Sequence, residues 1–153
     1  MLDGKIAYGA STPITITLNE LASSATAGRE STAIDNAINK FLDALVTVTL
    51  KAADAALADD KAAYIYAYGS EDGTNYSDMA TGSDAAHTPK ALPLVKVIPL
   101  EQNLSQRVVF AIAQAFGGVM PRKWGIVVRN YSGQVLTAAD NSASYTGIYS
   151  TAG

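Results

Sequence analysis

Short runs of alternating residues recur along the chain, with the period of two that is typical of β-strands with one buried face. The clearest is Tyr-Ile-Tyr-Ala-Tyr at 64–68, which is followed by a turn-rich segment at 69–75. Residues 14–18 (Ile-Thr-Ile-Thr-Leu) and 46–50 (Val-Thr-Val-Thr-Leu) alternate in the same way. The pattern predicts a strand at each of the three alternating runs.

Three further runs that are rich in apolar residues indicate strands. Residues 94–98 are bounded by proline on both sides. Residues 125–130 are β-branched and lead through a Ser-Gly turn to 134–136, which predicts a hairpin. Residues 108–113 suit either a buried strand or a buried helix, and the shortness and β-branching of the run favour a strand.

One segment, 34–45, is ambiguous. Its apolar residues recur at helical spacing after Ser31 and Thr32, two residues that commonly precede a helix. From the pattern alone an amphipathic helix is permitted. The apolar positions are Ile34, Ile38, Phe41, Leu42 and Leu45.

Six or more short strands separated by turns predict an all-β sandwich or barrel rather than alternating strands and helices. The 153 residues contain no linker-like stretch, so we assign a single domain spanning 1–153. The core is expected to form from the inward residues of the alternating runs. These are Ile16, Val48, Ile65 or the Tyr64/Tyr66/Tyr68 face, Val97, Phe110 and Val127.

Composition argues against several classes of function. The chain has no Cys and a single His, which excludes disulfides, thiolate chemistry and a multi-histidine metal site within one chain. The net charge is −3, so nucleic-acid binding is not expected. No apolar run approaches the ~20 residues that span a bilayer, and the first residues do not resemble a secretory signal, so no membrane association is expected.

No catalytic, cofactor or metal site is predicted. The only histidine, His87, lies in a polar loop at 82–89 without a recognisable partner, and catalytic groups meet across a fold rather than along the sequence. Adjacent acids such as Asp59-Asp60 normally point into solvent. Oxygen donors at 71–78 admit calcium, but their spacing is not that of an EF-hand. They are Glu71, Asp72, Asn75, Ser77 and Asp78.

Charge is divided between two parts of the chain. Residues 54–84 carry seven acids and one base, whereas 90–129 carry six bases and one acid. One interpretation is two solvated faces, with the acidic stretch exposed. The other is a pair of complementary patches that dock copies of the chain or a partner.

Candidate partner-binding residues fall into two groups. Trp124 sits beside Arg122 and Lys123; a lone Trp at the start of an apolar strand is commonly a core or interface anchor, and it could also stack on a sugar or base. The uncharged segment 142–153 suits an arm or edge strand, as does 1–12. The residues of the C-terminal arm expected to bind are Tyr145, Ile148 and Tyr149.

Parts of the chain resemble small structural proteins of tailed bacteriophages. The resemblance is carried by residues 115–133 (Ala-Phe-Gly-Gly-Val-Met-Pro-Arg-Lys-Trp-Gly-Ile-Val-Val-Arg-Asn-Tyr-Ser-Gly), and by 28–36 and 64–69. It implies a jelly-roll-like β-sandwich on the virion that serves as a capsid cement or decoration protein without catalytic residues. In that setting residues 34–45 would be mainly extended.

The resulting hypothesis is a non-enzymatic virion structural protein on the capsid surface that stabilises the shell by bridging major capsid protein subunits. Its expected partners are the major capsid protein and copies of itself, as a homo-oligomer in the particle. The alternative is a tail-associated carbohydrate-binding sandwich, with Trp124 and the tyrosines as stacking platforms.

Overall fold

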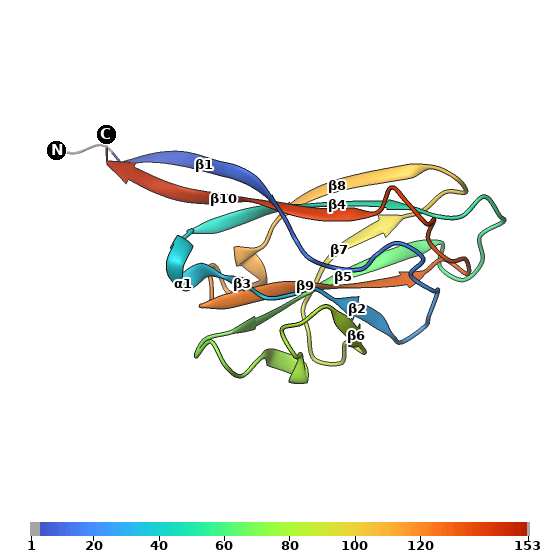
Figure 1. The fold of residues 1–153 in the computed structure, drawn as a ribbon, viewed down its shortest axis with the longest axis horizontal. Coiled ribbons are helices and arrows are strands. Elements are labelled where there is room, and N and C mark those ends of the chain that lie inside the picture. Colours follow the sequence, from blue (N-terminus) through green and yellow to red (C-terminus); the bar gives the residue numbers. More distant parts are fainter. Residues whose placement is uncertain (1–3, 153) are drawn as a thin grey trace.

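In the computed structural model, which describes residues 4–152, two antiparallel sheets pack face to face (Figure 1). The first sheet has the strand order β1-β10-β4-β8. Its strands are β1 (Gly4–Pro13), β4 (Asp43–Lys51), β8 (Ser105–Ala111) and β10 (Ser142–Ala152). The predicted all-β sandwich is therefore confirmed.

The second sheet has the order β6-β2-β9-β5-β7, with β3 also pairing with β9. Its strands are β2 (Gly28–Glu30), β3 (Ile34–Asp35), β5 (Ala62–Ser70), β6 (Ala85–His87), β7 (Leu94–Pro99) and β9 (Lys123–Tyr131). Three single turns of helix join the strands. They are α1 (Asn36–Asn39), η1 (Ser77–Met79) and η2 (Ala113–Phe116).

Alternation along β4 shows how the sequence builds the core. Ala44, Val46, Val48 and Leu50 are completely buried between the sheets, whereas the residues between them are half-buried on the other face. The opposite sheet supplies a large fully buried side chain, Trp124. Side chains of this size each contribute roughly 1.5–3 kcal/mol when taken out of water, so the inner faces supply most of the driving force for folding.

Five predicted strands are present. They are those at 46–50 (β4), 64–68 (β5), 94–98 (β7), 108–113 (β8, which ends at Ala111) and 125–130 (β9). Two other predictions are wrong. Residues 14–18 form no strand, because Thr17 binds the Asp84 carboxylate through both its N–H and its hydroxyl. Residues 134–136 form no hairpin with β9, because Leu136 forms an isolated bridge with Ala52.

The segment 34–45 is neither a helix nor mainly extended. Two residues of β3 lead into the single turn α1, which the Asp35 carboxylate caps by accepting from the Ala37 N–H at 2.8 Å. Lys40 ends the turn in a left-handed conformation with φ 54°. The Asn36 amide then bonds both main-chain groups of Phe41 at 3.0 Å, which stops the turn from extending.

The predicted burial is correct at Val48, Ile65, Phe110, Val127 and Tyr68, but Val127 and Tyr68 lie in a second, smaller cluster apart from the main core. Tyr64, Tyr66 and Ile16 are only half-buried. Val97 is a wrong prediction, since it is 39% exposed while the adjacent Ile98 is 1% exposed. The pairing of β7 with β5 shifts register between Ile65 and Tyr66, so the residues that pack against the core are Val95 and Ile98, and the sequence pattern does not reveal this shift.

The terminal segments are not free arms. Strand β10 lies between β1 and β4, pairing with β4 from Ser142–Thr49 to Ile148–Asp43. Ala143 and Tyr145 are buried, so the part of β10 beside β4 is a core strand. Only the end of β10 passes β4, where it pairs with the start of β1 up to Gly4–Ala152 and forms a two-stranded ribbon that projects from the sandwich (Figure 1).

Candidate functional site

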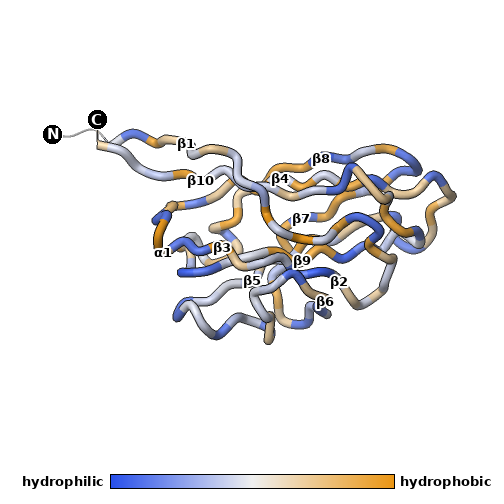
Figure 2. Tube along the Cα trace, in the orientation of Figure 1, coloured by the Kyte–Doolittle hydropathy of each residue, from blue (hydrophilic) through white to orange (hydrophobic). Residues whose placement is uncertain are grey.

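An apolar surface surrounds the helical turn α1, at the end of the sandwich from which the ribbon projects (Figure 2). Ile38 is 79% exposed and Leu42 58% exposed. Phe41 and Tyr149 are half-buried beside them. We call these four residues and the two pockets that flank them the α1 surface. Large apolar side chains gathered in one exposed place are typical of an interaction site.

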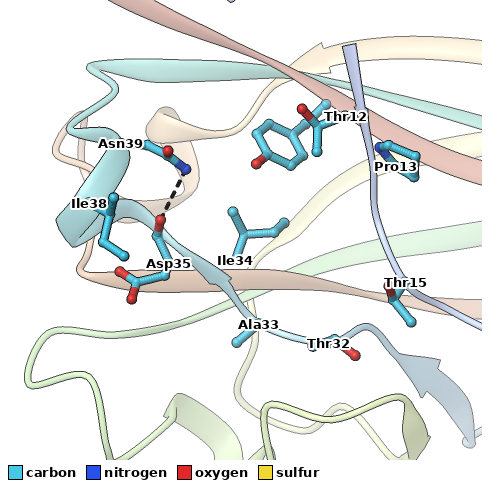
Figure 3. A pocket seen from close by; sticks show the side chains of 10 residues that line it. Thr12, Pro13, Thr15, Thr32, Ala33, Ile34, Asp35, Ile38 and Asn39 are labelled. Atoms are coloured by element: carbon cyan, nitrogen blue, oxygen red, sulfur yellow. Dashed lines mark hydrogen bonds between the residues drawn. The ribbon is translucent and has the colours of Figure 1, made fainter. Parts of the chain in front are cut away.

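The first pocket lies between the end of β1 and the segment that enters α1 (Figure 3). It has a volume of about 300 Å³. Ile34 and Tyr145 give it apolar walls, while Thr12, Thr32 and Asp35 give it polar ones. The Asp35 carboxylate is already used as the cap of α1, so this pocket has no free acid or base.

The second pocket lies on the other side of α1 and has a volume of about 520 Å³. It is lined by Asn39, Lys40, Phe41, Leu42, Tyr149 and Ser150. Asn39 lines both pockets, and among the described residues that line them only Asp35 and Lys40 are charged. Such a surface loses little solvation of charge when a partner covers it.

Four aromatic rings connect this surface to the core. Trp124 packs edge-on against Tyr145 with ring centroids 5.5 Å apart, and Tyr145 packs against Phe41 at 6.4 Å. Phe41 in turn contacts Tyr149 at 6.3 Å. A Cβ at Gly147 would overlap the Phe41 ring, so glycine leaves the space in which that ring lies. The surface is therefore held in place by rigid packing.

The structure brings most of the predicted binding residues to this end of the molecule. Tyr145 and Tyr149 line the two pockets. Lys123 of β9 lies opposite Asp35 in the strand pairing of β9 with β3. The Arg122 carbonyl accepts from the N–H of Asn36, the first residue of α1, at 2.7 Å. Ile148 lies on the ribbon, where it is half-buried and faces Tyr8 of β1.

Trp124 is the exception, because it is completely buried and has no surface to offer a partner. Its role is the core anchor that the sequence also allowed. The indole Nε1 has no hydrogen-bond partner among residues 4–152. Stacking of this ring on a sugar or base is thus incompatible with the fold.

Ile38, Phe41 and Leu42 were not predicted from the sequence as binding residues. The available signal was their helical spacing within residues 34–45. Only one helical turn, α1, forms in this segment. The apolar residues at helical spacing therefore cannot all face the core, and Ile38 and Leu42 remain exposed.

His87 is held between two carboxylates and is not a free base. Its Nε2 lies 3.1 Å from Asp78 Oδ2, and its Nδ1 lies 3.5 Å from Glu30 Oε2. Glu30 is completely buried and also accepts from Thr81 through both the N–H and the hydroxyl. The cluster fastens the loop between β5 and β6 onto β2.

The acidic stretch 54–84 is only partly a solvated face. Asp54, Asp59, Asp60, Glu71 and Asp72 are exposed, but Asp78 and Asp84 are half-buried and paired. Burial opposes ionisation of Asp84, yet hydrogen bonds from Arg29 and Thr17 lower its pKa below the ordinary value. Two acids of this stretch therefore stabilise the fold.

The suggested calcium ligands do not converge. The Asp72 carboxylate accepts from Asn75 and from Thr74 and Ser70 of its own loop, and these bonds lower its pKa. Asp78 is turned away toward His87. Within residues 4–152 no three His, Asp or Glu side chains are grouped as metal ligands. In the same range, no helix has the length and apolar character needed to cross a membrane.

No protein-family model matches the chain, and no curated protein is significantly similar to it.

Proposed function

We propose that the chain is a non-enzymatic structural protein of a bacteriophage particle that binds the shell through the α1 surface. The observation that carries the proposal is the exposed apolar pair Ile38 and Leu42, set on a rigid aromatic run at one end of the sandwich. Apolar and aromatic anchors beside preformed pockets are the typical centre of a protein–protein interface.

Chemistry at this surface is not supported by its residues. Among the described residues that line the two pockets, no nucleophile lies beside a base, since Asp35 caps α1 and the only histidine, His87, lies outside both pockets next to Asp78 and Glu30. A binding role needs no such pair. It needs shape, apolar contact and little loss of solvation, and the two pockets provide these properties.

The virion setting is supported by the resemblance of 115–133, 28–36 and 64–69 to small phage structural proteins. In that setting the partner is the major capsid protein. Many copies each bury a modest apolar area across neighbouring subunits, so that weak contacts add up over the shell. The carbohydrate-binding alternative is weakened because Trp124, its main stacking residue, is buried. The Tyr64 ring is covered by the Arg129 guanidinium, 4.6 Å from the ring centroid.

The experiment compares binding of variants to capsids that lack the protein. Replacing both Ile38 and Leu42 by Glu puts two charges into the proposed contact, and we expect occupancy to fall roughly tenfold or more. Both side chains are largely exposed in the isolated chain, so its thermal midpoint should change little. Occupancy is measured by gel densitometry of sedimented particles.

Leu104→Glu is the matched control. Leu104 is 46% exposed and immediately precedes Ser105, the first residue of β8, which pairs with Lys51 at the end of β4 that is far from α1. This variant should bind as the unmodified chain does. Equal occupancy of all three proteins would refute the α1 surface as the attachment site. Failure of the unmodified chain to bind, or to be present in purified particles, would refute the virion role itself.

A further inference from the structure

We propose that β1 pairs edge to edge with β1 of a second copy, forming an antiparallel dimer centred on Ala7. This inference concerns the β1 edge and is independent of the α1 surface and of any particle. It rests on four observations: the unprotected edge, the direction of its main-chain groups, the exposed apolar side chains and the two-stranded ribbon.

The outer edge of β1 is the least protected of the sheet edges in residues 4–152. Natural edge strands are usually short or carry charge or proline to prevent pairing. Strand β6 has three residues, β8 carries Arg107, and β7 carries Lys96 and Pro99. Strand β1 has ten residues, and between Lys5 and its final proline it has neither a charge nor a proline.

Ile6 and Tyr8 direct their main-chain groups toward this open edge. The Ile148 carbonyl accepts from the Leu42 N–H at 2.7 Å, on the side away from β1. The facing pair Tyr8–Ile148 is therefore not hydrogen-bonded across β1 and β10. The N–H and C=O of Tyr8 must point outward, and those of Ile6, two residues earlier, point the same way.

The side chains of the same two residues are exposed and apolar. Ile6 is 70% exposed and Tyr8 64% exposed, and their spacing places them on one face. In a register centred on Ala7, each Ile6 faces Tyr8 of the other copy. Aromatic and β-branched residues are favourable cross-strand partners, so the dimer would bury all four side chains together.

A second copy fits this edge better than an unrelated strand because the pairing is self-complementary. The only charged residue of β1 is Lys5, and in the Ala7-centred register it faces Gly9 rather than the other Lys5. The ladder ends at the bulge that follows Tyr8, where the register of β1 against β10 shifts. The ribbon projects from the sandwich, so antiparallel pairing places the two bodies at opposite ends (Figure 1).

A further strand would stabilise the two-stranded ribbon. Beyond Ile148 the sheet consists of β1 and β10 alone, since β4 begins at Asp43. Two strands without further neighbours are marginally stable in water. Pairing of two ribbons gives four adjacent strands and removes both open β1 edges.

The chain has no cysteine, so single-cysteine variants report the register directly. Ala7→Cys places two thiols opposite each other in a non-hydrogen-bonded pair, where the Cα separation of roughly 4.5 Å suits a disulfide. Lys5→Cys is the matched control on the same strand and face. Its two thiols would lie four residues apart along the ladder, roughly 14 Å, which is too far for a disulfide.

We expect Ala7→Cys to form a disulfide-linked dimer under mild oxidation and Lys5→Cys to remain monomeric on a non-reducing gel. Equal crosslinking of the two variants, or none from Ala7→Cys, would overturn the proposal. A second test uses Ile6→Pro in an otherwise unmodified chain, which removes an outward N–H and none that faces β10. Sedimentation equilibrium should show the unmodified chain associating and Ile6→Pro not; identical association would also overturn it.

Discussion

At the residue scale, hydrogen-bonded polar side chains stabilise the fold more than the sequence pattern indicated. Asp84 accepts hydrogen bonds from the Arg29 guanidinium at 2.6 Å and from Thr17 at 3.0 Å, which ties β2 to the segment after β1. The sequence identifies Asp84 as an acid but not its partners, because Arg29 and Thr17 lie 55 and 67 residues away along the chain. Contacts at that separation depend on the completed fold.

The hydrogen bonds of Asp84 with Arg29 and Thr17 predict that the free energy of unfolding falls in acid. The pKa of Asp84 is lowered in the folded state, so its contribution is present above the ordinary carboxyl pKa and is lost as pH falls through the lowered value. We expect Asp84→Asn to cost about 1–3 kcal/mol at neutral pH, and progressively less toward about pH 3. Urea unfolding across that pH range measures both.

Asp140→Asn is the control for this measurement. Asp140 is 64% exposed and lies 3.8 Å from Lys51, so its replacement should change the unfolding free energy by at most about 1 kcal/mol. A loss for Asp84→Asn that stays constant with pH would contradict the linkage.

At the element scale, strands whose residues alternate or are strongly β-branched were predictable, and irregular segments were not. The run at 46–50 became β4 because one side of its alternation is buried and both of its edges are paired. The equally regular run at 14–18 is not a strand, because its polar groups bind Asp84 and the segment that follows β2. Alternation reports which residues face inward, not whether a neighbouring strand exists.

A long and a short truncation of β10 are expected to affect folding differently. Removing residues 142–153 takes the strand between β1 and β4 away, together with the buried Ala143 and Tyr145, and should abolish cooperative unfolding. Removing only 149–153 shortens the ribbon beyond β4 and should leave the fold intact. Circular dichroism melting distinguishes the two. A folded 142–153 deletion would show that β1 and β4 do not need the strand between them.

At the scale of the whole molecule, the α1 surface and the β1 edge are two contacts with different requirements. The first offers apolar side chains and pockets, and the second offers main-chain groups and a short apolar face. Sequence reasoning located Tyr145 and Tyr149 for the first contact because an uncharged terminal segment is visible in a sequence. It assigned Trp124 to a partner because a lone aromatic in a sequence carries no information about burial.

The pairing of Gly4 with Ala152 predicts that the chain tolerates circular permutation. Joining the original ends with a short linker and opening the chain between Gly117 and Gly118, where both residues are exposed, should preserve the sandwich. We expect a far-ultraviolet circular dichroism spectrum like that of the unmodified chain. A permutant opened between Thr49 and Leu50, inside β4, should not fold. Unfolding of both would contradict the prediction.

The central position of β10 also fixes when the protein can fold during synthesis. The first sheet cannot close until residues 142–152 have left the ribosome, because β10 separates β1 from β4. Until then β4 lacks one of its two neighbouring strands. Translation that stops before residue 142 therefore leaves an unpaired edge of β4, which can pair with other chains.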